Sequence, residues 1–239
     1  MKKLLVANYK MNGNINFYQK VSKVLNRLKS EDTIVLCPPF VYMPFLKIKN
    51  ENMYLGSQDI AMGIDKKSTG QTSAVMLNEF GVKYAIIGHS ERREIGETDA
   101  VIAKKVEIAH QYDITPIVCV GEKSKTDKLD ILKKQVETAL KFAQNKHIVF
   151  AYEPVWAIGT GEQPTIEKIN SAISLIKKTA KKCGFEISVL YGGSVNLSNY
   201  KEVAKAEIDG YLMGGVSLKI EDFVSIIKGE WWIKVSWWF

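Results

Sequence analysis

The sequence predicts an α/β protein that forms one closed (β/α)8 barrel. Short apolar runs without alternation occur eight times, and stretches of helical periodicity lie between them. The 239 residues therefore divide into units of about 30 residues, the length of a minimal βα unit. Continuous apolar runs are typical of parallel strands that are covered on both faces. No segment rich in Gly, Ser or Pro divides the chain, so we expect a single barrel domain over residues 1–230.

The expected strands are rich in branched apolar residues. In chain order they are Leu4–Ala7, Ile34–Cys37, Met53–Leu55, Tyr84–Ile87, Ile117–Val120, Ile148–Tyr152, Ile187–Tyr191 and Tyr211–Met213.

Two connecting segments show the helical period clearly. The residues that would share a helix face are Phe17, Val21, Val24 and Leu28 in the first, and Ile166, Ile169, Ile173 and Ile176 in the second. Gly184 follows the second segment at a position that suits a C-terminal cap.

An open, doubly wound sheet is the competing fold. Such a sheet normally carries a Gly-rich fingerprint after its first strand. Here the first strand is followed by Asn8-Tyr9-Lys10-Met11-Asn12, and GxGxxG occurs nowhere in the chain. The closed barrel is therefore the better interpretation.

Composition limits the partners that the chain is expected to bind. The net charge is +7, but only Arg27, Arg92 and Arg93 among the 33 basic residues are arginine. Because arginine is the preferred side chain for bidentate phosphate and base contacts, a lysine-rich surface favours solubility over nucleic-acid binding. Three scattered histidines and three cysteines without CxxC spacing indicate no metal site.

The sequence also predicts a cytoplasmic protein with no membrane association. The apolar run after Met-Lys-Lys covers only Leu4–Ala7, which is too short for a signal peptide. No run approaches the ~18 apolar residues of a membrane span.

Polar residues gather where the expected strands end, which is where barrel enzymes carry their active sites. Asn8 and Lys10 follow the first strand at i, i+2 spacing, so both point the same way if strand geometry persists. GHSERR (88–93) follows the fourth strand, and EPVWAIGTG (153–161) follows the sixth. Gly-rich turns at 191–194 and 214–215 end the last two strands, at a common place for phosphate binding through backbone N–H groups.

These motifs together resemble the triosephosphate isomerase family. The Asn8-x-Lys10 pair, GHSERR, AYEPVWAIGTG (151–161) and YGGS (191–194) occur in the family's order and near its spacing. The resemblance runs from Leu4 to about Lys228 and implies a TIM barrel.

The resemblance implies an isomerase that interconverts dihydroxyacetone phosphate and D-glyceraldehyde 3-phosphate through an enediolate, without a metal or organic cofactor. It assigns Glu153 as the base, His89 as the neutral electrophile and Lys10 as the electrostatic stabiliser. Glu91 would order Lys10 and Ser90. The expected substrate-binding residues are Asn8, Lys10, Gly159, Ser194, Gly214 and Gly215.

The stretch from Pro154 to Gly161 is interpreted as a lid that excludes water from the enediolate. The family often has lysine and small residues at the far hinge, whereas this chain has Glu162-Gln163-Pro164. Because proline fixes one backbone angle, we expect altered lid kinetics with intact chemistry.

The resemblance further implies a homodimer in which Thr69 reaches the partner's active site. The family's Thr-Gly-Glu is Thr69-Gly70-Gln71 here, so the interface loses a carboxylate that normally pairs with an arginine.

Two alternatives remain open at this point. A catalytically silent barrel that acts as a binding protein would require damage at Asn8, Lys10, His89 or Glu153, and all four are present. The second alternative is a nucleic-acid or membrane-surface protein, which the net charge of +7 and the aromatic segment 231–239 would favour. That segment, WWIKVSWWF, matches nothing in the family pattern and has no assigned role.

Overall fold

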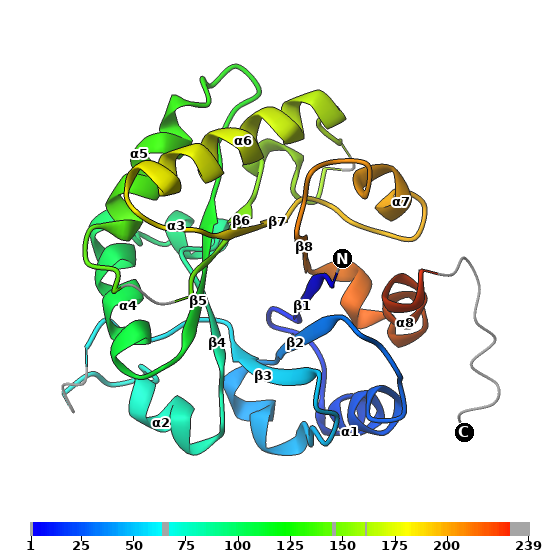
Figure 1. The fold of residues 1–239 in the computed structure, drawn as a ribbon. Helices are drawn as coiled ribbons and strands as arrows, with labels where there is room; N and C mark the ends of the chain where they lie inside the picture. Colours follow the sequence, from blue (N-terminus) through cyan, green and yellow to red (C-terminus); the bar gives the residue numbers. More distant parts are fainter. Residues whose placement is uncertain (1, 64–66, 145–146, 161, 230–239) are drawn as a thin grey trace.

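The computed structural model describes residues 2–63, 67–144, 147–160 and 162–229. Its strands pair in chain order and in parallel, and β8 closes the ring against β1 (Figure 1). The strands are β1 (Leu4–Asn8), β2 (Thr33–Cys37), β3 (Met53–Ser57), β4 (Tyr84–Ile87), β5 (Thr115–Val120), β6 (Val149–Tyr152), β7 (Ser188–Tyr191) and β8 (Gly210–Met213).

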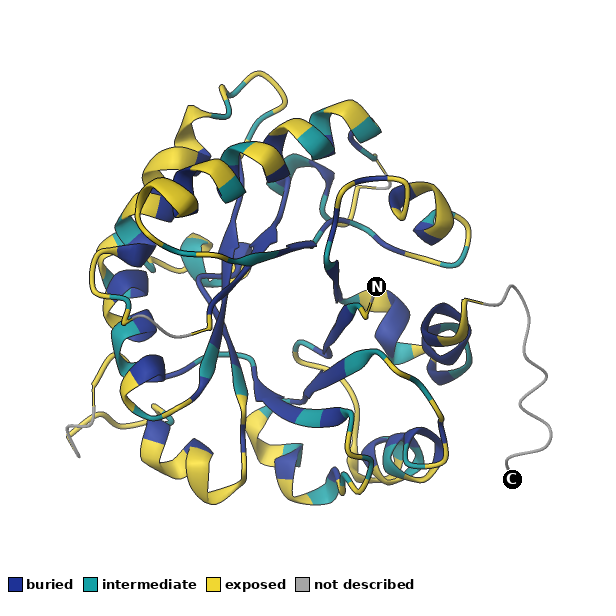
Figure 2. Ribbon diagram, viewed as in Figure 1, coloured by how far each residue is buried: buried dark blue, intermediate teal, exposed yellow. Residues whose placement is uncertain are grey.

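Helices surround the barrel, with their buried faces toward the strands and their exposed faces outward (Figure 2). The α-helices are α1 (Ile15–Leu25), α2 (Ala74–Glu79), α3 (Ser90–Glu94), α4 (Asp99–Gln111), α5 (Asp130–Leu140), α6 (Ile166–Lys182), α7 (Tyr200–Val203) and α8 (Ile220–Lys228). Three short 3₁₀ helices complete the set: η1 (Phe40–Phe45), η2 (Val155–Ala157) and η3 (Gly215–Leu218).

The predicted fold class is confirmed. Both ends of each predicted strand lie within two residues of the ends of the observed strand. The first predicted helix is too long, because α1 ends at Leu25 and Leu28 packs in the core beyond it. Gly184 follows the capping residue of α6 with φ of +87°, as a C-terminal glycine does.

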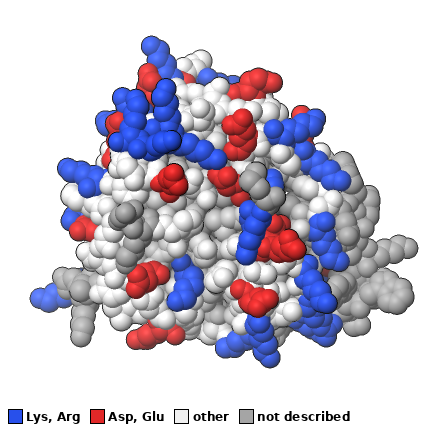
Figure 3. All heavy atoms as spheres, viewed as in Figure 1, with Lys and Arg blue, Asp and Glu red and all other residues white. Residues whose placement is uncertain are grey.

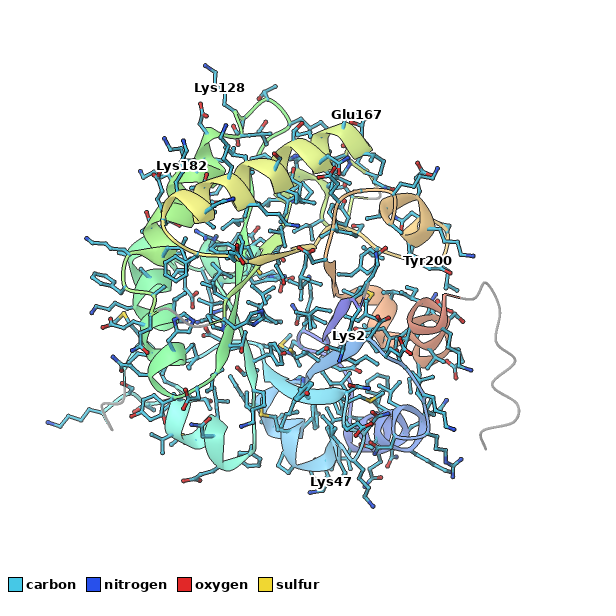
Figure 4. All side chains as sticks on the ribbon, viewed as in Figure 1. Lys2, Lys47, Lys128, Glu167, Lys182 and Tyr200 are labelled. Carbon is cyan, nitrogen blue, oxygen red and sulfur yellow. The ribbon has the colours of Figure 1, made fainter. Side chains whose placement is uncertain are left out.

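The core has two apolar layers, because strand residues point alternately inward and outward. Leu5 and Ala7 of β1 pack in the larger layer, between the strands and the helices. Leu4 and Val6 belong to the smaller cluster, which fills the barrel interior. Side chains occupy the space that the ribbon leaves open at the centre (Figure 4).

Charged side chains of both signs are scattered over the face shown in Figure 3, with carboxylates interspersed among the basic side chains. Among the described helices, none is long and apolar enough to cross a bilayer. The described residues also contain no group of three or more His, Cys, Asp or Glu arranged to hold a metal ion. Segment 231–239 lies outside the described residues.

Candidate active site

The last inward position of several strands carries a polar residue of the site. On β6, Val149 and Ala151 belong to the barrel interior, and Glu153 takes the next inward position. The same alternation on β1 ends in Asn8. A polar layer therefore closes the carboxyl end of the barrel.

A cavity of about 380 Å³ opens above this layer. It brings together eight of the residues predicted from sequence: Asn8, Lys10, His89, Glu153, Gly159, Ser194, Gly214 and Gly215. Asn196, Lys219 and Asp222 also line it, although sequence reasoning did not select them.

The Glu153 carboxylate is buried and lies against a backbone N–H and an imidazole nitrogen. Its Oε2 accepts a hydrogen bond from the Ser90 backbone N–H at 3.1 Å, and its Oε1 lies 3.2 Å from Nε2 of His89. Its own backbone N–H donates to the Val120 carbonyl at 2.8 Å, which fixes the start of the loop after β6. No lysine or arginine nitrogen of the described chain lies within ion-pair distance of this carboxylate.

His89 enters the cavity because the chain turns at Gly88, whose φ is +70°. Its Nδ1 accepts a hydrogen bond from the Glu91 backbone N–H at 3.2 Å. An accepting Nδ1 places the proton of a neutral imidazole on Nε2, the atom that faces Glu153. The ring can therefore donate from Nε2 into the cavity.

Lys10 lines the cavity, but its backbone conformation differs from the extended one expected from sequence. Strand β1 ends at Asn8, and Lys10 has φ of +49°, so strand geometry does not persist to Lys10. Asn8 Oδ1 stabilises this turn by accepting from the Lys10 backbone N–H at 3.0 Å. Gln58, which sequence reasoning gave no site role, holds it from the other side, because its Nε2 donates to the Lys10 carbonyl at 2.8 Å.

Glu91 lies beside the cavity, with its Oε1 2.7 Å from Nζ of Lys10. The predicted contact with Lys10 is present. The backbone N–H of Ser90, however, bonds to Glu153 and not to Glu91.

The described part of the predicted lid, residues 154–160, lies against the loop after β7. Ser194 Oγ donates to the Ala157 carbonyl at 3.0 Å and accepts from the Gly159 N–H at 3.1 Å. Gly161, the last residue of the predicted lid, lies outside the described residues. Gly214 and Gly215 lead into η3, whose first N–H groups lack intrahelical partners, as at any helix start.

Two glycines allow the chain to approach Glu153 closely. A Cβ on Gly192 would lie 2.8 Å from Cγ of Glu153, and one on Gly121 would lie 1.6 Å from its carbonyl oxygen. Any larger residue at either position would displace Glu153.

Thr69 is exposed and lines neither this cavity nor the smaller one beside it. The smaller cavity, of about 200 Å³, shares Lys10 and His89 with the first and is bordered by Gly70 and Gln71. Arg92 has carboxylate partners within its own chain, since its Nη2 lies 2.9 Å from Asp59 Oδ2 and 2.7 Å from Glu97 Oε1.

A second buried carboxylate, Glu122, was missed by sequence reasoning. It follows β5 directly after Gly121 and is fully buried. Its Oε1 accepts from the Tyr152 hydroxyl at 2.9 Å and from Nε1 of Trp156 at 3.0 Å. The rule that selected polar residues at strand ends would have found it, because it lies two residues after the last residue of β5.

Cys119 on β5 packs inside the barrel. Burial, followed by the nearby Glu153 charge, raises the pKa of its thiol well above the usual value. Such a thiol stays protonated and unreactive.

The whole chain is similar to known proteins. The family model described as "Triosephosphate isomerase" matches residues 3–230. A relative named triosephosphate isomerase from Clostridium tetani (strain Massachusetts / E88) is 38% identical over 95% of this chain and 96% of its own length. Relatives with the same name from Albidiferax ferrireducens and Psychromonas ingrahamii are 39% and 36% identical, each over 95% of this chain and 98% of their own length.

Proposed function

Because the chain belongs to the triosephosphate isomerase family, a family of aldose–ketose isomerases, we propose that it interconverts dihydroxyacetone phosphate and D-glyceraldehyde 3-phosphate. The observation that carries the proposal is the geometry of one cavity. Glu153 and His89 lie 3.2 Å apart in it, with Lys10 in the same lining.

Glu153 acts as the base that moves a proton between the two adjacent carbons. No lysine or arginine of the described residues pairs with its carboxylate, so substrate can replace the Ser90 N–H without breaking such an ion pair. The close approach at Gly192 keeps the carboxylate near the cavity floor.

His89 acts as the electrophile, donating from Nε2 to the oxygen that becomes negative in the enediolate. Lys10 adds a fixed positive charge, and Asn8 holds the turn that places it. The groups proposed to bind the phosphate are the backbone N–H groups of Gly159, Gly214 and Gly215 and the hydroxyl of Ser194. The Ser194 hydroxyl donates to the Ala157 carbonyl and the Gly159 N–H donates to Ser194, so a phosphate would replace these contacts. The docked lid excludes water, which matters because an exposed enediolate phosphate eliminates inorganic phosphate.

A coupled assay in both directions tests this proposal against the alternative of a silent binding barrel. We expect turnover of both triose phosphates, and a fall in kcat of about 10²-fold in Glu153→Asp, because the carboxylate retreats by about one methylene. Failure of the wild type to interconvert them, with unchanged behaviour in Glu153→Asp, would overturn the enzyme proposal.

We also propose a homodimer in which the loop carrying Thr69 approaches the partner's active site. Met11 is 94% exposed next to Lys10, and Ile95, 73% exposed, lines a hollow together with Met62 and Gln71. Exposed apolar groups of this kind mark a contact surface.

Sedimentation velocity tests the dimer. We expect a dimeric wild type, a monomeric and less active Met11→Asp variant, and an unchanged Ile131→Asp control on α5. A wild type that is monomeric and fully active would contradict the proposal.

The domain boundary and the location are also proposals. The family match over residues 3–230 supports a barrel that functions without segment 231–239. The free thiols of Cys37, Cys119 and Cys183 support a cytoplasmic location. Deletion of residues 231–239 is expected to leave isomerase activity unchanged, and loss of activity would place the segment within the functional unit. Fractionation of source cells tests the location.

A further inference from the structure

Lys168 links the two ends of the lid. It lies in the first turn of α6, and its backbone N–H donates to the side chain of Thr165, which caps this helix just after the lid. Its ammonium reaches back to the start of the lid, where Nζ lies 4.8 Å from the ring centroid of Trp156. Lys168 thus contacts the start of the predicted lid through its side chain and the residue just after the lid through its backbone.

The same ammonium neutralises the buried Glu122. Nζ of Lys168 lies 3.3 Å from Glu122 Oε1, the atom that also accepts from Trp156 Nε1. A fully buried carboxylate needs a counter-charge, and Lys168 is the only cation at ion-pair distance within the described chain. Trp156 is therefore held at its N–H by Glu122 and at its ring by the cation that neutralises Glu122.

A second lysine reinforces this arrangement. Nζ of Lys125 lies 5.1 Å from the Trp156 ring centroid, and its ammonium pairs with Glu162 beyond the lid. The Lys125 carbonyl in turn accepts from Nζ of Lys168 at 3.4 Å.

Helix stability does not explain a lysine at this position. The N-terminal end of α6, marked by Glu167 in Figure 4, carries the positive end of the helix dipole, so a cation in the first turn is unfavourable. A residue that breaks a local rule while making specific contacts points to a role in the site.

We propose that Lys168 is a positioning residue that holds Trp156, and with it the lid, in the docked conformation over the cavity. The inference rests on the proposed isomerase function, because the lid has a task only if an enediolate forms beneath it. Docking here means the contacts of Ala157 and Gly159 with Ser194. Without Lys168 the lid docks less often, so the intermediate meets water and loses its phosphate.

The test compares Lys168→Met with wild type in two assays. We expect kcat/KM to fall about tenfold, as for the loss of a partly desolvated cation–π contact. Inorganic phosphate released per isomerisation is expected to rise by a similar factor. In the exposed enediolate the oxyanion forms a C=O bond, the C=C bond shifts to the phosphate-bearing carbon and the C–O bond to phosphate breaks, which leaves a three-carbon enol that becomes a 2-oxoaldehyde. Lys168→Arg keeps the charge and the ring contact, and should restore both values to within about twofold.

Lys177→Met is the matched control. Lys177 lies on the same helix and pairs with Asp209 at 2.8 Å, away from the lid. We expect this variant to behave as wild type. Equal phosphate release in Lys168→Met, Lys177→Met and wild type would overturn the proposal.

A spectroscopic measurement reports on the surroundings of Trp156 without requiring turnover. In protein labelled with 5-fluorotryptophan, the Trp156 resonance is assigned by its loss in Trp156→Phe. Lys168→Met should shift or broaden this resonance, and Lys177→Met should not. An inactive wild type would refute the isomerase proposal alone, since this readout does not need turnover.

If Lys168→Met fails to fold, the double variant Glu122→Gln/Lys168→Met removes the buried charge as well and keeps an acceptor for Trp156. It should release phosphate and shift the Trp156 resonance as predicted for the single variant. If it instead matches wild type in both measurements, Lys168 serves only as a counter-charge and the proposal is wrong.

Discussion

Glu153 and Glu122 are two buried carboxylates at neighbouring strand ends, and their surroundings differ. Glu153 follows β6 and is bonded by a backbone N–H and by an imidazole nitrogen. Glu122 follows β5 and is bonded by a phenol, an indole and the ammonium of Lys168. The same side chain thus occupies a neutral environment at one strand end and an ion pair at the next.

The difference indicates which carboxylate can take up a proton. A carboxylate whose partners are neutral can exchange them for substrate, whereas one that neutralises a buried lysine stabilises its surroundings only while it stays charged. Burial alone would not distinguish them, since both are nearly inaccessible to solvent.

The largest expected effect is on turnover. Glu153→Gln should lower kcat by about 10²–10⁴-fold, because the amide cannot accept the proton. Glu122→Gln keeps an acceptor for Tyr152 and Trp156, and should lower kcat by less than about tenfold. Steady-state kinetics on both variants measure the contrast, and equal losses would remove the distinction between the two carboxylates.

The second expected effect is on stability, and here the substitution at Glu122 should have the larger effect. Glu122→Ala leaves the Tyr152 hydroxyl and the Trp156 N–H without their acceptor, so the free energy of unfolding should fall by about 2–4 kcal/mol. Glu153→Ala should cost less, because Glu153 and His89 line a cavity that water can enter. Urea unfolding of both variants tests this order. A larger loss in Glu153→Ala would contradict it.

A smaller effect is expected at the far end of the lid. Pro164 is buried just before the cap of α6 and restricts the backbone there. Pro164→Ala should change kcat by about two- to fivefold, since a proline restricts the flexible chain by about 0.4–1 kcal/mol. Turnover in buffers of increasing viscosity measures it. Unchanged turnover and unchanged viscosity dependence would show that this proline does not control the lid.

The smallest effect concerns the thiol beside Glu153. Burial raises the pKa values of Cys37 and Cys119, whereas Cys183 is exposed. Native protein at pH 8 should therefore react with a thiol reagent at Cys183 alone, and the other two should react after unfolding. Rapid native labelling of Cys119 would mean that the β5 end is more open than the structure indicates.

Much of the site was predictable because its residues follow strands in a regular way. Glu153 and Asn8 continue the inward alternation of β6 and β1, so an apolar run followed by a polar residue was enough to find them. Lys10 was found by its spacing from Asn8, although its left-handed backbone removes the geometric reason for that spacing.

Contacts between distant segments could not be predicted in the same way. Lys168 was one lysine among many on a helix, and nothing local to it indicates Glu122 or Trp156. Arg92 likewise finds Asp59 only because the closed barrel brings β3 and β4 together.

The order of residues along the chain is enough to predict the eight βα units and eight of the seventeen residues that line the cavity, because buried strands and their polar ends leave a pattern of short range. The charge environment of each buried carboxylate follows only from the tertiary structure, including the contrast between Glu122 and Glu153, the proposed base. The environment of each carboxylate depends on whether a cation from a distant helix lies within about 4 Å of a carboxylate oxygen. Such a contact joins residues that are far apart in the sequence, so it cannot be predicted from the order of residues.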